Sequence, residues 1–189
     1  MSTLERETKE TRITAGVAIG GGAAPGGVEV ATGDGFLDHM VETLARYAGL
    51  SVKLEAEGDL RHHLVEDVAL TLGLALAHEV PAEATRYGWA LVPMDDALVQ
   101  AAVDVGGRPW YEGRLPSPLY EHFLRSFSTN LAATVHVKVV RGRDKHHVVE
   151  AAVKAVGLAL RQALSPSAAR GEGVFSTKGS VRLREVDGT

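Results

Sequence analysis

One stretch of fifteen residues occurs twice in this chain, and this duplication limits the possible folds more than any other feature. The first copy, residues 62–76, reads HHLVEDVALTLGLAL, and the second, residues 146–160, reads HHVVEAAVKAVGLAL. Eight of the fifteen positions are identical. In both copies the residues after His-His-x-x-Glu are mostly Ala, Val and Leu at helical spacing. Each copy is therefore predicted to form a buried helix.

The polar residues at the start of each predicted helix indicate metal binding. Residues four apart share one face of a helix, so His62 and Glu66 should lie together, as should His146 and Glu150. His63 lies about 100° further around the helix axis and points elsewhere. Two imidazoles that leave one turn in different directions suggest two metal ions, each shared between the two copies.

The duplication extends beyond these two helices. His39 precedes His62 by 23 residues and His122 precedes His146 by 24, and both lie in predicted amphipathic helices, 35–48 and 118–132. In the first helix Asp34 is the expected N-cap and Gly49 the expected stop. Strands are expected at 11–19, 28–31, 51–57, 86–93, 98–105, 109–115 and 133–142. The first two are expected to form a hairpin across the glycine-rich run 20–27.

Together these elements predict an α+β fold of two internally duplicated half-domains, with two mixed β-sheets packed on a layer of about four helices. The first repeat should span about 11–84 and the second about 85–168, followed by a tail at 169–189. With 189 residues, 45% of them hydrophobic, the whole of 1–189 is expected to form a single unit.

Composition excludes several classes of function. The formal net charge of −4 gives no reason to expect a nucleic-acid or membrane partner. No apolar run approaches ~18 residues, and the charged N-terminus is unlike a signal peptide. The chain has no cysteine, which excludes disulfides and thiolate metal sites and fits a cytoplasmic protein.

Without sulfur, the candidate metal ligands are imidazoles and carboxylates, which suit Mn, Fe, Ni and Zn. Six histidines and two glutamates provide four ligands for each of two ions. The candidates are His39, His62, His63, Glu66, His122, His146, His147 and Glu150. The order His-His-x-x-Glu differs from the His-Glu-x-x-His of metalloproteases, so each glutamate is interpreted as a ligand. His78, beyond the apolar run, is interpreted as a surface residue, and the unmatched His136 as structural.

Several further stretches carry a resemblance to a known family. They are Arg6-x-Thr-Lys-Glu-Thr11, Gly35-Phe-Leu-Asp-His-Met40, His62-His-x-x-Glu-Asp67, Arg86-Tyr-Gly, Pro93-Met-Asp-Asp-Ala-Leu98, Val103-Asp-Val-Gly-Gly-Arg-Pro109, His146-His-x-x-Glu-Ala with Lys154, and Ser176-Thr-Lys-Gly179. With these motifs in this order, the chain resembles the imidazoleglycerol-phosphate dehydratases of histidine biosynthesis over nearly its whole length.

The resemblance implies a reaction and a set of partners. The family removes water from imidazole glycerol phosphate, a phosphorylated imidazole, to give imidazole acetol phosphate. It uses two divalent ions per site, most often Mn²⁺, to hold the imidazole. It assembles as a homo-oligomeric shell of twenty-four subunits, with active sites between protomers. Two other readings of the residues stay open: another dinuclear metal enzyme on the same scaffold, and a histidine-rich metal-storage or structural protein.

The resemblance also assigns roles to individual residues. Glu10, which by itself looks like a surface charge in an N-terminal strand, becomes the proton shuttle and a substrate contact, and Glu150 a second acid/base. The substrate phosphate is assigned to Arg86, Arg108, Lys154, Ser176 and Lys178. Lys154 also counts among the catalytic residues. It interrupts an apolar helix four residues after Glu150, so it should share that face and have an anionic partner. Thr43 and Tyr47 stand where the family usually has Gln and His, in part of its phosphate grip.

Overall fold

A computed structural model of the chain describes residues 1–20 and 27–166. The strands are β1 (Ser2–Glu7), β2 (Thr11–Ile19), β3 (Val28–Ala31), β4 (Leu50–Gly58), β5 (Tyr87–Met94), β6 (Ala97–Asp104), β7 (Trp110–Gly113) and β8 (Thr134–Arg141). The helices are α1 (Gly35–Ala48), α2 (Arg61–Ala77), α3 (Pro118–Asn130) and α4 (Lys145–Leu164). The part of the chain that the structure describes contains no helix long and apolar enough to span a membrane.

The strands form two four-stranded mixed sheets with the same arrangement, which confirms the predicted α+β class. The strand orders are β1-β2-β4-β3 and β5-β6-β8-β7. In each sheet one pair is parallel, β3 with β4 and β7 with β8, and the other pairs are antiparallel. A parallel pair needs a crossover connection, and α1 and α3 provide it. The expected hairpin of 11–19 with 28–31 is therefore wrong, because β4 lies between those strands.

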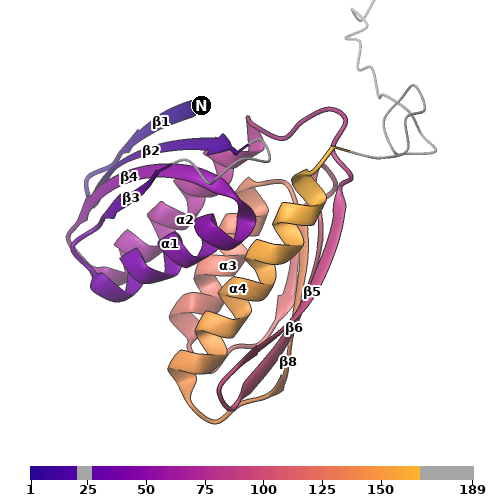
Figure 1. Ribbon diagram of the computed structural model, residues 1–189. Helices are drawn as coiled ribbons and strands as arrows, with labels where there is room; N and C mark the ends of the chain where they lie inside the picture. Colours follow the sequence, from indigo (N-terminus) through magenta and orange to yellow (C-terminus); the bar gives the residue numbers. More distant parts are fainter. Residues whose placement is uncertain (21–26, 167–189) are drawn as a thin grey trace, which may run out of the picture.

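The four helices form a layer between the two sheets (Figure 1). α1 packs on α4, and α2 packs on α3, so each helix pair joins the two halves of the chain. Gly73 and Gly157, which occupy the same place in the duplicated stretch, make this possible. A Cβ atom at Gly73 would lie 2.5 Å from the Phe127 carbonyl oxygen, and one at Gly157 would lie 3.1 Å from the Leu44 carbonyl oxygen. Both glycines thus allow the helix backbones to approach closely.

Local signals determine where the helices begin and end. The Asp34 carboxylate accepts hydrogen bonds from the backbone N–H groups of Phe36 and Leu37 at the start of α1, and Gly49 ends that helix with a φ of 71°. Both predicted caps are confirmed. Asp144 caps α4 in the same way, accepting from the N–H of His146 at 2.7 Å. These caps place His146 and His147 in the first turn of α4, and His39 just after the first turn of α1.

Candidate metal centres

Glu150 lies between two imidazoles from different halves of the chain. Its Oε2 atom is 3.2 Å from Nε2 of His39 on α1 and 3.0 Å from Nε2 of His146 on α4. The ligand atoms of these three residues lie within 4.8 Å of one another. The glutamate is buried, whereas the side chains of His39 and His146 remain about half exposed. This arrangement, which we call group one, can hold a metal ion that stays accessible from outside the chain.

A second group of the same composition joins α2 to α3. Glu66 places Oε2 3.3 Å from Nε2 of His62 and Oε1 3.2 Å from Nε2 of His122. The His122 Nε2 atom is buried, and it has no hydrogen-bond partner among the described residues even though the carboxylate is near. A buried ring nitrogen without a partner is costly, and a metal ion would satisfy it. This group two therefore fits the donor set of a divalent ion.

The starts of all four helices meet around Phe36. Its ring lies 4.9 Å from the Tyr120 ring on α3 and 5.2 Å from the His146 ring on α4. At the start of α2, Arg61 forms an ion pair with Asp34, the N-cap of α1. Because of these contacts, groups one and two lie at the same end of the helix layer.

The two groups differ at one neighbouring position. Lys154 on α4 donates from Nζ to Oε1 of Glu150 at 2.9 Å, and its ammonium lies 5.5 Å from the centre of the Tyr47 ring. The matching position in α2 is Leu70. Burial raises the pKa of the Glu150 carboxyl, but hydrogen bonds from Lys154 and His39 outweigh it, so this pKa lies below its usual value. The expected anionic partner of Lys154 is confirmed.

His63 and His147 belong to neither group. The Nδ1 atom of His63 lies 2.8 Å from Oδ1 of Asp59, and that of His147 lies 2.8 Å from Oδ1 of Asp96. These hydrogen bonds raise the pKa of both imidazoles. A carboxylate behind one ring nitrogen is the usual way in which a protein orients a histidine whose other nitrogen binds metal. Neither carboxylate is among the site residues predicted from the sequence, although Asp59 lies four residues before His63.

Glu10 lies in the turn between β1 and β2, so the expectation that it forms part of a strand is wrong. Its Oε2 atom is 3.6 Å from Nδ1 of His63. The turn borders an open hollow of about 350 Å³. The Glu10 side chain is thus exposed to solvent beside the partly exposed imidazole of His63.

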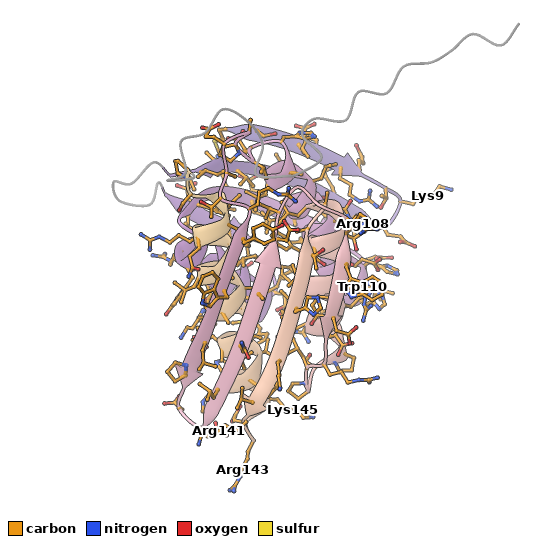
Figure 2. All side chains as sticks on the ribbon, turned by 90° about the vertical axis from the view of Figure 1, so that its right-hand side faces the viewer. Lys9, Arg108, Trp110, Arg141, Arg143 and Lys145 are labelled. Carbon is orange, nitrogen blue, oxygen red and sulfur yellow. The ribbon has the colours of Figure 1, made fainter. Side chains whose placement is uncertain are left out.

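Of the predicted phosphate ligands that the structure describes, Lys154 lies at group one, whereas Arg86 and Arg108 lie at the other end of the second half. The Arg86 backbone N–H donates to Ala163 at the far end of α4, and its guanidinium donates to Asp104 and to the Val105 carbonyl. Seventeen residues of α4 separate Ala163 from His146, a distance of about 25 Å. Figure 2 shows Arg108 at this end of the second sheet and Lys145, at the start of α4, at the other. Ser176 and Lys178 lie outside the described residues.

The other two histidines lie apart from both groups. His78 is exposed at the end of α2, with its Nδ1 atom 3.5 Å from the Ser2 hydroxyl, which confirms its surface position. His136 is exposed on the outer face of β8 and borders a hollow of about 720 Å³ with Gln100, Glu112 and Lys138.

Comparisons with known proteins agree with this geometry. Residues 32–160 match the sequence model of the family described as imidazoleglycerol-phosphate dehydratase. The enzyme of that name from Pyrobaculum calidifontis is 45% identical over 196 residues, covering 95% of this chain and 100% of the relative. The one from Caldivirga maquilingensis is 41% identical, covering 94% and 97%.

Two solved structures are similar as well. The crystal structure of IGPD from Pyrococcus furiosus in complex with (S)-C348 superposes with a TM-score of 0.81 at 39% identity, covering 94% of this chain and 100% of that one. The imidazoleglycerol-phosphate dehydratase from Staphylococcus aureus superposes with a TM-score of 0.77 at 30% identity, covering 88% and 100%. With this fold, these two groups of candidate metal ligands and these relatives, the chain belongs to the imidazoleglycerol-phosphate dehydratase family, the hydro-lyases of histidine biosynthesis.

Proposed function

We propose that this chain dehydrates imidazole glycerol phosphate to imidazole acetol phosphate at a site that holds two divalent metal ions. The observation that carries this proposal is the pair of matched groups, each with two imidazole nitrogens and one carboxylate. Neither group contains sulfur, which favours Mn²⁺ or a similarly hard ion. Ions bound there would act as Lewis acids toward the imidazole ring of the substrate.

The proton transfers are assigned to carboxylates of the chain. Dehydration removes a proton from carbon and supplies one to the departing hydroxyl, so a base and an acid must lie beside the substrate. Glu10 is exposed at its turn and free to reach a substrate, and we assign it the proton transfer. Glu150 is held by His39, His146 and Lys154, and we assign it metal ligation with a second acid/base role.

We propose that a complete active site combines residues of more than one subunit. Arg86 and Arg108 lie too far from groups one and two of their own chain to share one small substrate with them. His63 and His147 point away from those groups, with a carboxylate behind each ring. Neighbouring copies would bring these sets together. The twenty-four-subunit shell implied by the resemblance would provide such neighbours, and each subunit would be a single unit of two repeats.

The phosphate would then bind to cations from two ends of the molecule. Arg86 and Arg108 would come from one copy and Lys154 from another, together with Ser176 and Lys178 of the tail. Guanidinium and ammonium groups bind phosphate through charge-assisted hydrogen bonds. The lack of cysteine supports a cytoplasmic location, where disulfides are rare.

The test is direct conversion by the metal-loaded protein. Purified protein is stripped with chelator, reloaded with Mn²⁺ and supplied with imidazole glycerol phosphate, and the acetol phosphate is measured. We expect product only from the reloaded protein, with about two ions bound per chain. A protein that binds Mn²⁺ and releases no product would contradict the proposal.

A further inference from the structure

Asp67 is a buried carboxylate next to the metal-binding Glu66, and it points away from group two toward the first sheet. Its Oδ1 atom lies 3.0 Å from the guanidinium of Arg6 on β1. Its Oδ2 atom accepts a hydrogen bond of 2.5 Å from the hydroxyl of Thr11, the first residue of β2. Asp67 therefore binds both strands that flank the turn carrying Glu10.

The contacts continue from Thr11 into the turn itself. An ionised carboxylate only accepts, so Thr11 donates its single hydroxyl proton to Asp67. The Thr8 hydroxyl lies 3.1 Å from the Thr11 hydroxyl and 3.5 Å from the Thr11 carbonyl oxygen, and we assign its proton to the nearer acceptor, the Thr11 hydroxyl. The two remaining lone pairs of Thr8 accept the backbone N–H groups of Glu10 at 3.1 Å and of Thr11 at 3.0 Å. The hydroxyls of Thr11 and Thr8 thus each donate once. A continuous series of hydrogen bonds connects the Asp67 carboxylate with the backbone N–H of Glu10.

The other side of Glu10 is held as well. Its carbonyl accepts a hydrogen bond of 3.0 Å from the N–H of Asp59, two residues before α2. Asp59 also binds His63, whose ring lies 3.6 Å from the Glu10 carboxylate. The Glu10 backbone is thus tied to α2 through Asp67 at one point and through Asp59 at another. Its side chain remains exposed.

Among the described residues, up to 166, the second half of the chain has no such connection. The residue that matches Asp67 is Ala151. There, the turn between β5 and β6 is held directly by Asp96, which accepts from the N–H groups of Arg143 at 2.5 Å and of Asp144 at 3.2 Å. A carboxylate in the position of Asp67 is therefore not a requirement of the repeated fold. It occurs in the half whose turn carries Glu10.

We propose that Asp67 is a positioning residue that fixes the turn of residues 8–11 and, through it, the carboxylate of Glu10. The proposal rests on the proton-transfer role proposed for Glu10. An acid/base group acts efficiently only when its oxygen stays within hydrogen-bond reach of the proton, and a displacement of about 1 Å can cost about 100-fold in rate. Arg6, Thr8, Thr11 and Asp67 together supply that restraint.

The experiment uses the full chain loaded with Mn²⁺ and five variants of this network and its surroundings. Asp67→Asn leaves a single acceptor oxygen, whereas Arg6 and Thr11 each donate to one oxygen of the carboxylate. Thr11→Val removes the hydroxyl with little change of volume, and Thr11→Ser restores it. Arg12→Gln is the matched control, because Arg12 pairs with Glu7 at 2.8 Å across the same two strands but on the exposed face. Glu10→Gln tests the role of Glu10 separately.

We expect Asp67→Asn and Thr11→Val to lower kcat by about 10- to 100-fold, with KM and bound Mn²⁺ within twofold of the parent. Thr11→Ser and Arg12→Gln should keep the parent kcat. Hydrogen exchange should become faster at the amides of Glu10 and Thr11 and stay unchanged in α2. If Asp67→Asn does not fold, the comparison of Thr11→Val with Thr11→Ser tests the same prediction.

Three results would overturn the proposal, and they can be told apart. If Glu10→Gln is inactive while Thr11→Val has the parent kcat, Asp67 has no positioning role. If kcat falls only together with bound Mn²⁺, Asp67 supports Glu66 rather than the turn. If Glu10→Gln keeps full turnover, the proposed role of Glu10 is wrong, and Asp67 has no catalytic group to position.

Discussion

Lys154 donates a hydrogen bond of 2.9 Å to Glu150, and Leu70 occupies the matching position beside Glu66. The two metal groups therefore have the same ligand types but different charge around them. An ammonium beside the Glu150 carboxylate offsets part of the negative charge in group one, and group two lacks it. We therefore expect Lys154 to bind an anion at group one, where an ammonium is available to it.

Replacing Lys154 by methionine keeps the length of the side chain and removes its charge. A charge-assisted hydrogen bond to phosphate is worth about 1.5–3 kcal/mol, so we expect kcat/KM to fall by about 10- to 100-fold. Titration with inorganic phosphate as a competitive inhibitor should show a weaker inhibition constant. Lys53→Met, at an exposed lysine of β4, is the control and should leave both values unchanged. An unaltered inhibition constant in Lys154→Met would exclude Lys154 from phosphate binding.

His122 provides a test of group two. Its buried Nε2 atom lies near Glu66 but has no hydrogen-bond partner among the described residues, so of the candidate ligands it has the most to gain from an ion. His122→Asn should therefore reduce bound Mn²⁺ from about two ions per chain to about one, measured by metal analysis after dialysis. His78→Asn, at the exposed end of the same helix pair, should bind as many ions as the parent. Two ions in the His122 variant would show that this imidazole is not a ligand.

The pair of His147 and Asp96 should give a defined pH dependence to the stability of the metal-free protein. The hydrogen bond from His147 lowers the pKa of Asp96 to about 2 and raises that of His147 above 6.5. The raised imidazole pKa stabilises the fold below pH 6.5, and this contribution is lost as the pH rises through the folded-state pKa. The lowered carboxyl pKa stabilises the fold above pH 3.8, and its contribution is lost as the pH falls toward 2.

Asp96→Asn should consequently destabilise the protein most between about pH 4 and 6.5. Urea unfolding of parent and variant across pH 3–9 measures the difference. The difference in unfolding free energy should shrink toward both ends of that range. What remains there is the contribution of the hydrogen bonds from backbone N–H groups to Asp96. A difference that is constant with pH would mean that the imidazole and the carboxylate are not coupled.

Gly73 tests the close approach of α2 and α3. A methyl group there would lie 2.5 Å from the Phe127 carbonyl oxygen, so the helices must separate. Overpacking of this kind costs about 1–3 kcal/mol, and we expect Gly73→Ala to lose that much in a denaturant titration. It should also weaken Mn²⁺ binding by group two, whose ligands come from these two helices. Gly35→Ala, which meets no atom within 4 Å, should be close to neutral.

Much of this molecule follows from short-range features of its sequence. Helix periodicity and the caps at Asp34 and Gly49 determine α1, because an N-cap carboxylate and a left-handed glycine act on the backbone within one turn. The four-residue spacing of His62 and Glu66 is enough to put an imidazole and a carboxylate on the same face. Repetition of that pattern, with His39 and His122 at similar distances before it, indicated the ligands of both groups.

Other features depend on contacts between residues far apart in the chain, and these contacts form only when the chain folds. Helix pairing across the halves joins His39 to Glu150 and His122 to Glu66, and the parallel position of β3 excludes the expected hairpin. Asp67 meets Thr11 across 56 residues, and His147 meets Asp96 across 51. Local propensity carries no information on such contacts, because they arise only when sheets and helices pack. Spacing along the chain thus predicted the candidate metal ligands, and packing brought six of the eight together in two groups of three within one chain.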